Sequence, residues 1–145
     1  MLTSTRDAAS IEVRRLSPAE WPSAFPAISQ LRRLDKAEFL QFVGRQSYSG
    51  YELIGAFIAG KLIGLLGMRP VHTLARGPFL HIDDLIVIAS HRGSGAGRAL
   101  MDYAEADARM RKMNWVFLDA KPGAVAFYER RDYVPHPAPS MKKAL

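Results

Sequence analysis

The sequence predicts an α+β domain in which a mixed β-sheet is flanked by helices. Short runs of alternating or β-branched apolar residues, typical of strands, are interleaved with segments whose apolar residues recur at helical spacing. From the N-terminus these segments follow the order β, α, α, β, β, β, α, β, α, β, β. Such an order fits a sheet with helices packed on its faces. The length of 145 residues suits one domain spanning residues 1–145.

The N-terminal part is expected to hold one strand and an irregular helical segment. Residues 1–9 are expected to be flexible, whereas residues 11–16 alternate between apolar and polar side chains as a strand does. A helix begins after Ser17, which is followed by a proline and, three residues on, by a glutamate. Pro22 and Pro26 fall inside that helix and predict that it is short or broken.

A second helix and a hairpin come next. Asp35 begins the helix, apolar residues recur at helical spacing after it, and Gly44 or Gly50 ends it. Residues 51–58 and 62–69 are two apolar runs joined by a tight turn that contains glycine. They predict a pair of antiparallel strands.

The central part of the chain is expected to form a loop, a strand, a long helix and a further strand. Residues 70–78 begin and end with proline and predict the loop. Residues 79–88 predict the strand, and residues 97–113 predict a helix that Asn114 ends in the left-handed conformation. Residues 115–118 predict a short buried strand.

The C-terminal part is expected to contain a short helix and two last strands. Residues 121–123 include proline and glycine and break the chain, after which residues 124–131 predict a helix. Residues 133–134 and 140–144 predict the last strands, with three prolines between them. These strands offer a contact through which two copies of the chain could pair as a homodimer.

The composition narrows the possible classes of protein. Lys and Arg outnumber Asp and Glu by 20 to 14, giving a formal charge of +6, but the basic residues are scattered and not interleaved with aromatics. This distribution favours a small anionic ligand over nucleic acid. The chain has no cysteine, so it has no disulfide, no zinc-thiolate site and no cysteine nucleophile, which fits a cytoplasmic location.

Membrane and metal partners are also not expected. The longest apolar run, residues 53–68, is interrupted by Lys61 and is too short to span a membrane. The N-terminus lacks the apolar core of a secretory signal. The four histidines show no metal-ligand spacing on a helix, so we expect no metal, although any of them could supply a base.

A glycine-rich turn between the strand at 79–88 and the helix that follows is the most informative feature of the chain. Gly93, Gly95 and Gly97 lie at this junction, with Arg92 before them and Arg98 after them. Glycines let backbone N–H groups approach a ligand closely, and the start of a helix carries unpaired N–H groups and partial positive charge. The turn therefore predicts a site for a phosphate-bearing ligand.

Other glycine turns fit less well. A Rossmann dinucleotide turn needs a glycine where this chain has Arg98, and residues 89–92 separate the strand from the first glycine. Asp119, at the end of the next strand, is the one feature that keeps a nicotinamide or other nucleotide ligand possible. A Walker A loop is excluded because the chain has no Gly-Lys-Ser/Thr sequence.

Two motifs give the chain a resemblance to a known family. The spacing Leu85-x-Val87 followed by Arg92-x-x-Gly95-x-Gly97 resembles the acetyl-CoA-binding motif of the GNAT superfamily of N-acetyltransferases. Downstream, the stretch 124–133 is similar to the family helix with the pattern Ala-x-x-x-Tyr-Glu-x-x-Gly-Phe. The resemblance runs from about residue 11 to the C-terminus and is closest to members that acetylate small amines. It implies a central, mostly antiparallel sheet of six to seven strands with about four helices.

The resemblance implies acetyl-CoA as co-substrate and assigns residues to it. Backbone groups of Leu85, Ile86 and Val87 would pair with the amides of the pantetheine arm. The N–H groups of the turn would hold the pyrophosphate. The residues expected at the cofactor are Leu85, Ile86, Val87, Arg92, Gly93, Ser94, Gly95, Ala96, Gly97, Arg98, Lys121 and Tyr128. Lys121 stands where the family often has asparagine, and Asp132 replaces a glycine, although aspartate tolerates the left-handed conformation.

The resemblance also implies catalytic candidates. Tyr128 would protonate the departing thiolate or bind it through a hydrogen bond, whereas periodicity alone would make it a core tyrosine beside Phe127. Asp84 stands where similar enzymes carry a base or an acceptor-binding carboxylate. Asp83 and Asp84 are adjacent on a strand, so we expect them to point to opposite faces, and both could equally be structural.

The predicted function is transfer of acetyl from acetyl-CoA to a primary amine by direct attack. A small-molecule amine or a protein amino group would be the acceptor; amino acids, polyamines, aminophosphonates and aminoglycosides all remain open, and the +6 charge disfavours polycations. The alternative of a different class is a non-catalytic CoA-binding or protein-interaction module on the same fold. A nicotinamide- or nucleotide-binding protein is the third alternative.

Overall fold

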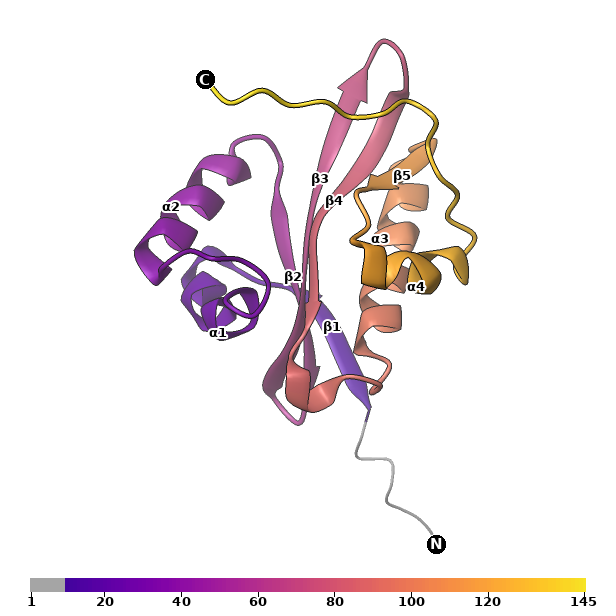
Figure 1. Ribbon diagram of the computed structural model, residues 1–145. Coiled ribbons are helices and arrows are strands. Elements are labelled where there is room, and N and C mark those ends of the chain that lie inside the picture. Colours follow the sequence, from indigo (N-terminus) through magenta and orange to yellow (C-terminus); the bar gives the residue numbers. More distant parts are fainter. Residues whose placement is uncertain (1–9) are drawn as a thin grey trace, which may run out of the picture.

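The computed structural model describes residues 10–145, in which five strands form one sheet with helices on both faces (Figure 1). The strands lie side by side in the order in which they occur in the chain. They are β1 (Ile11–Arg15), β2 (Glu52–Ile58), β3 (Lys61–Thr73), β4 (Gly77–Val87) and β5 (Trp115–Leu118). Neighbours from β1 to β4 are antiparallel and β5 is parallel to β4, so the α+β class with a mostly antiparallel sheet is confirmed. The expected flexibility of residues 1–9 lies outside the described residues.

Helices cover the two faces of the sheet in sequence order. On one face lie a 3₁₀ segment, η2 (Pro18–Ala24), and the helices α1 (Phe25–Ile28) and α2 (Lys36–Ser47). On the other face lie α3 (Ala96–Met110) and α4 (Val125–Glu129) (Figure 1). Short 3₁₀ turns, η3 (Ala89–His91) and η4 (Pro122–Ala124), lead into α3 and α4. None of the helices in residues 10–145 combines the length and the apolarity that a membrane crossing requires.

Local capping explains where the first helical segments begin. The Asp35 side chain accepts a hydrogen bond from the Glu38 N–H at 2.8 Å, and the Glu38 side chain accepts one from the Asp35 N–H at 3.0 Å. This reciprocal capping box satisfies backbone donors that the first turn of a helix leaves unpaired. The same arrangement stands at Ser17. The predicted helix starts are confirmed there and at Asp35, as is the short, broken helical segment around Pro22.

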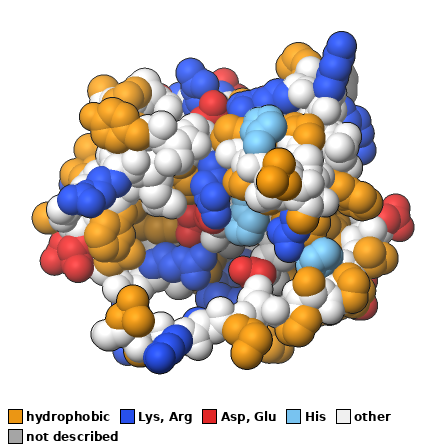
Figure 2. Space-filling view, turned by 90° about the horizontal axis from the view of Figure 1, so that it is seen from above, with side chains coloured by type: hydrophobic (Ala, Val, Ile, Leu, Met, Phe, Trp, Pro, Cys, Tyr) orange, Lys and Arg blue, Asp and Glu red, His pale blue; other side chains and the backbone are white. Residues whose placement is uncertain are grey.

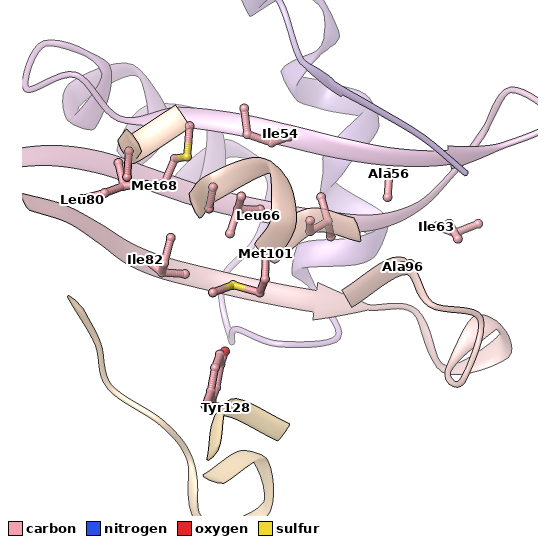
Figure 3. Packing of buried hydrophobic residues seen from close by; sticks show 13 residues of the cluster. Ile54, Ala56, Ile63, Leu66, Met68, Leu80, Ile82, Ala96, Met101 and Tyr128 are labelled. Atoms are coloured by element: carbon pink, nitrogen blue, oxygen red, sulfur yellow. The ribbon is translucent and has the colours of Figure 1, made fainter. Parts of the chain in front are cut away.

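Two hydrophobic cores sandwich the sheet because its strands alternate their side chains between the faces. The core under α3 and α4 includes Ile54, Leu66, Met68, Leu80 and Met101, each at most 1% exposed (Figure 3). The core under α1 and α2 contains the alternate strand residues, such as Leu53 and Leu65, together with helix residues such as Phe39. Full burial of each such side chain stabilises the fold by about 1.5–3 kcal/mol.

The loop predicted at residues 70–78 is wrong, because β3 and β4 continue as a long hairpin almost to its tip. Pairs run outward to Thr73 and Gly77, leaving residues 74–76 as the turn. Pro70 is tolerated because β3 outruns its partner β2, whose pairing ends at Met68. A proline on the unpaired edge of a strand removes no ladder hydrogen bond.

The two last strands predicted at residues 133–134 and 140–144 are also wrong, which explains why the described sheet has five strands rather than six or seven. Pro135, Pro137 and Pro139 occupy alternate positions, so in a strand their missing N–H groups would all belong to the same edge. The tail instead crosses from α4 over the β3–β4 hairpin towards the side of α2 (Figure 1).

The ends of α3 and α4 share one left-handed motif. Met113 N–H donates to Ala108 C=O at 2.9 Å, and Lys112 takes φ 59°, so Lys112 rather than the predicted Asn114 is the left-handed stop of α3. At α4, Tyr133 N–H donates to Tyr128 C=O at 3.1 Å and Asp132 takes φ 70°. The expectation that Asp132 supports the left-handed turn is confirmed.

A β-bulge in β4 interrupts the regular alternation of side chains. Asp84 pairs with Gly67 of β3 and Ile82 pairs with Met68, so Asp83 is an extra residue that has no partner on β3. As a result Ile82 and Leu85, three residues apart, both pack into the core under α3. The bulge re-aims the strand and sets the position of both aspartates.

Gly67, opposite the bulge, leaves the space that the ring of Tyr51 occupies. Tyr51 is 6% exposed, and its hydroxyl donates to Asp84 Oδ2 at 2.6 Å. A Cβ at Gly67 would clash with the Tyr51 hydroxyl and lie 2.7 Å from Asp84 Oδ2. Because Gly67 has no side chain, the Tyr51 hydroxyl can reach Asp84 and form this hydrogen bond.

We expect Gly67→Ala to lower the free energy of unfolding by about 1–3 kcal/mol, because the added methyl group must displace the Tyr51 ring. Gly44→Ala is the matched control, since a Cβ on that helical residue meets nothing within 4 Å. It should stabilise the protein by about 0.5–1 kcal/mol. Urea unfolding of both variants tests this, and an unchanged midpoint for Gly67→Ala would contradict it.

Candidate functional site

Strands β4 and β5 diverge after a short stretch of pairing. Their parallel register covers four residues of each strand and ends at Ile82 opposite Leu118. Beyond that point Leu85, Ile86 and Val87 pair with β3 alone, so within residues 10–145 their other edge is open. An open strand edge offers backbone donors and acceptors to an extended ligand.

The glycine turn lies directly after this open edge. Gly93 and Gly95 have φ values of 83° and 92°, and α3 begins at Ala96. Arg92, Ser94 and Arg98 are exposed. The turn thus places flexible positive charges beside the start of a 15-residue helix, whose first N–H groups have no partner within the helix.

Some backbone N–H groups of the turn already donate hydrogen bonds within the protein, and others do not. The Ser94 N–H donates to the His91 carbonyl at 3.2 Å, and the Ala96 N–H donates to the Ser94 hydroxyl at 3.3 Å. In the described part of the chain, the N–H groups of Gly93 and Gly95 make no such bond. A Cβ at Gly93 would meet nothing within 4 Å, so no side chain of residues 10–145 packs against that position of the turn.

Gly97 brings the glycine turn close to α4. A Cβ at this position would lie 3.6 Å from the Phe127 ring and 3.8 Å from a methyl group of Val87. The first turn of α3, the end of β4 and α4 therefore meet at one point. Tyr128, the next residue on α4, packs in the same core as Leu85 and Val87 of β4.

Tyr128 is nearly buried, and its hydroxyl is directed from α4 towards the sheet (Figure 3). Its ring makes edge contacts with Phe127 at 5.1 Å and Tyr133 at 5.7 Å between ring centroids. Burial alone raises the pKa of its phenol above the ordinary value, with no charged or hydrogen-bonding neighbour contributing. A phenol that stays protonated can donate a hydrogen bond or a proton to a group developing negative charge.

The C-terminal end of α4 is anchored to α3 by a charged network. Arg131 donates to Asp102 at 2.7 Å and to Glu105 at 3.1 Å, and the Tyr133 hydroxyl donates to Glu105 at 2.9 Å. Burial and the bond to Glu105 raise the pKa of Tyr133. The network fixes the short helix that carries Tyr128.

Both aspartates of the bulge lie on the face of α2, so the prediction that they point to opposite faces is wrong. Asp84 contacts Gly67, and the Asp83 Oδ2 accepts from Arg69 Nε at 2.8 Å. Gly67 and Arg69 are two residues apart on regular β3 and therefore share a face. The extra residue of the bulge is the reason, because it cancels the alternation between Asp83 and Asp84.

Each aspartate is held by two partners. Asp84 accepts from Arg32 Nε at 3.1 Å as well as from the Tyr51 hydroxyl, and Arg32 also donates to the Asp83 carbonyl at 2.8 Å. Burial would raise the pKa of Asp83, but hydrogen bonds from His81 and Arg69 outweigh it and hold the pKa below its ordinary value. Burial, reinforced by Asp84, raises the pKa of Tyr51 well above its usual range.

Aromatic and cationic side chains continue this surface towards the hairpin tip. Arg76 lies over the Phe117 ring at 4.0 Å, and His136 of the C-terminal tail meets the same ring edge-on at 5.2 Å. Figure 2 views this end of the molecule and shows acidic, basic and histidine side chains gathered at the centre, with the tail crossing in front of a hollow. The surface beside the bulge is thus polar and accessible.

Sequence reasoning located one half of the site better than the other. The open edge, the glycine turn and Tyr128 are brought together, whereas Lys121 is exposed at the start of η4 and no contact ties it to them. The cluster around Asp83 and Asp84 was missed in part, because the sequence did not predict that Arg32, Tyr51 and Arg69 bond to these aspartates. Arg32 and Asp84 are 52 residues apart, and no local pattern signals such a pair.

Comparison with known proteins agrees with this geometry. The family model described as the acetyltransferase (GNAT) family matches residues 11–133. A relative from Bacillus subtilis, described as the uncharacterized N-acetyltransferase YhdJ, is 33% identical over 109 residues, which cover 72% of this chain and 75% of that protein.

Solved structures share the fold. A Trypanosoma brucei acetyltransferase superposes with a TM-score of 0.78 at 23% identity, over 94% of this chain and 100% of that one. A ribosomal-protein-alanine N-acetyltransferase from Brucella melitensis gives 0.75 at 21% identity, over 94% and 99%. The family match extends over most of the sequence and includes both motifs, and the chain therefore belongs to the GNAT family of acetyltransferases.

Proposed function

We propose that the protein transfers an acetyl group from acetyl-CoA to a primary amine by direct attack of the amine on the thioester. The observation that carries this proposal is the meeting of an open strand edge, an unfilled glycine turn and a buried phenol at one point. These three features match the three parts of the thioester substrate: its amide-bearing arm, its diphosphate and its sulfur.

The residues present fit CoA. Backbone groups of Leu85, Ile86 and Val87 are free to pair with the amides of the pantetheine arm, as an added strand pairs with a sheet edge. The N–H groups of Gly93 and Gly95 and the start of α3 suit the diphosphate. Each contact of this kind contributes about 0.3–2 kcal/mol, so several must act together.

Tyr128 is proposed as the proton donor. The amine nitrogen forms a bond to the carbonyl carbon of the thioester, and the carbon–sulfur bond breaks with its electron pair moving to sulfur. A phenol kept neutral by burial can protonate that sulfur or bind it by hydrogen bond. The chain lacks cysteine, the commonest acyl-enzyme nucleophile, which supports attack without a covalent enzyme intermediate.

The names of similar proteins support amine acetylation without choosing the acceptor. The Bacillus subtilis relative is described as an N-acetyltransferase. Structural neighbours are described as acting on ribosomal-protein alanine, glucosamine 6-phosphate and aminoglycosides, at identities of 18–21%. The same fold therefore serves acceptors of very different size and charge, and we propose the polar surface beside the bulge as the place where the acceptor binds.

Gly95→Ala should weaken CoA binding about tenfold, because an alanine resists the left-handed conformation by roughly 1–2 kcal/mol and misaligns the N–H groups of the turn. Gly60→Ala is the matched control: Gly60 has a similar φ of 79° in the β2–β3 turn, with nothing within 4 Å of a Cβ. It should lose comparable stability and keep its affinity. Titration calorimetry measures both, and wild-type protein that binds no CoA at millimolar concentration would refute the proposal.

Tyr128→Phe should lower turnover about 10²-fold while CoA affinity changes little, because phenylalanine keeps the ring contacts and removes only the donor. Tyr103→Phe on α3, a tyrosine packed against the same core, is the control and should keep full turnover. Release of free thiol from acetyl-CoA with a panel of amines measures turnover. Wild-type protein that binds CoA but releases no thiol with any amine would favour the non-catalytic CoA-binding alternative.

A further inference from the structure

His81 lies where the β4–β5 pairing is about to end. It pairs with Arg69 of β3 and with Phe117 of β5, one position before the last pair at Ile82. Its side chain is 20% exposed. Because Leu80 and Ile82 on either side pack into the core under α3, His81 points to the opposite face of the sheet from Tyr128.

We propose that His81 is the general base of the acetyl transfer, and that Asp83 positions its imidazole ring. This inference rests on the proposed function and adds to it the residue that removes a proton from the acceptor amine. Two further observations support it: the tautomer that Asp83 imposes on the ring, and the state of the two carboxylates that would otherwise serve as bases.

The ring of His81 is oriented by a carboxylate. Its Nδ1 lies 3.1 Å from Asp83 Oδ1. An ionised carboxylate only accepts hydrogen bonds, so Nδ1 carries the hydrogen and Nε2 keeps its lone pair. Asp83 is itself fixed by Arg69, which donates to its other oxygen at 2.8 Å, so the ring is held by a chain of two contacts. Nε2 is the atom left to accept a proton.

The aspartates are less suited to this role than the imidazole. Both oxygens of Asp84 accept hydrogen bonds, from Arg32 and Tyr51, and both oxygens of Asp83 are engaged by Arg69 and His81. Imidazoles have ordinary pKa values of about 6.5 and aspartates of about 3.9, against about 10.4 for an alkylammonium. An imidazole is therefore the closer match to an amine by more than two units and is the better base near neutral pH.

Charged groups from several elements lie around the ring. Asp83 on β4 contacts His81 directly, and Arg69 on β3 contacts Asp83. Arg76 and His136 face the neighbouring Phe117 ring from the hairpin turn and from the tail. From the side of α1, Arg32 pairs with Asp84.

The protons balance in this scheme. His81 Nε2 takes one proton from the acceptor ammonium, and the neutral nitrogen then attacks the thioester carbon. As the carbon–sulfur bond breaks, Tyr128 gives its proton to sulfur, and the second proton lost by the nitrogen replaces it through solvent. His81 releases its proton to water, so one proton is set free for each acetyl group transferred. Base and acid act from opposite faces of the sheet, near the point where the β4–β5 pairing ends.

The test compares His81→Gln, Asp83→Asn and a control, His72→Gln, which changes an exposed histidine on β3. For wild type and the control, kcat/KM with a panel of primary amines should rise with pH as an imidazole loses its proton. His81→Gln should lack this rise and lose about 10²-fold in kcat/KM at neutral pH. Asp83→Asn should move the rise to lower pH, because the imidazolium loses its stabilising negative charge.

A second measurement does not depend on finding the acceptor. In ¹⁵N-labelled protein, the ring signals of His81, assigned by their absence in His81→Gln, should show the Nδ1–H tautomer and shift on saturation with acetyl-CoA, while those of His72 stay in place. CoA affinity by calorimetry should be the same in wild type and His81→Gln.

Two results would overturn the inference while CoA binding stands: a His81→Gln variant with wild-type rate and an unchanged pH profile, or a His81 ring whose signals ignore bound acetyl-CoA. Failure of the wild type to bind CoA would instead reject the proposed function, and this inference with it. The two failures are distinguishable, because loss of CoA binding is seen in the wild type alone, whereas failure of the His81 assignment is seen in protein that still binds CoA.

Discussion

The β-bulge in β4 is the feature on which both the core and the candidate site depend. One extra residue, Asp83, lets Ile82 before it and Leu85 after it pack into the same core under α3. Without it, regular alternation would turn Leu85 and Val87 away from that core. The same bulge places both aspartates on the face of α2 and follows directly on the last pair between β4 and β5. A packing requirement and a polar site thus have one structural origin.

The bulge also organises the charges of the site. An aspartate that is largely withdrawn from water must be paired, and here each aspartate is bonded to an arginine from another element, Arg32 after α1 and Arg69 on β3. The bond from Arg32 ties the segment after α1 to β4, and the bond from Arg69 joins β3 to β4. On the other face the network around Arg131 fixes α4 and hence Tyr128. Polar contacts thus fix the elements on both faces of the sheet near the open edge of β4, and the two hydrophobic cores stabilise the sheet between them.

Parts of the fold governed by local chemistry were predictable from sequence. The start of α2 follows from Asp35 and Glu38, whose reciprocal hydrogen bonds need only three residues of separation. Asp132 could be expected to replace a glycine because aspartate tolerates positive φ, and it has φ 70°. The errors lie in two proline-containing segments, and in each the effect of proline depended on neighbouring strands that the sequence does not show. Pro70 lies in a strand whose outer edge is unpaired, whereas the three prolines of the tail prevent a strand.

By itself the sequence determined the order of strands and helices as far as α4, the glycine turn and the helix that carries Tyr128, because these depend on side-chain type and short spacing. Only the tertiary structure decided that Asp83 and Asp84 share a face, that Arg32 and Tyr51 reach Asp84 across 52 and 33 residues, and that His81 lies at the end of the β4–β5 pairing. A bulge is a property of two strands in register, and its position is set by how both faces of the sheet pack. The sequence of one strand alone therefore does not show where a bulge will form.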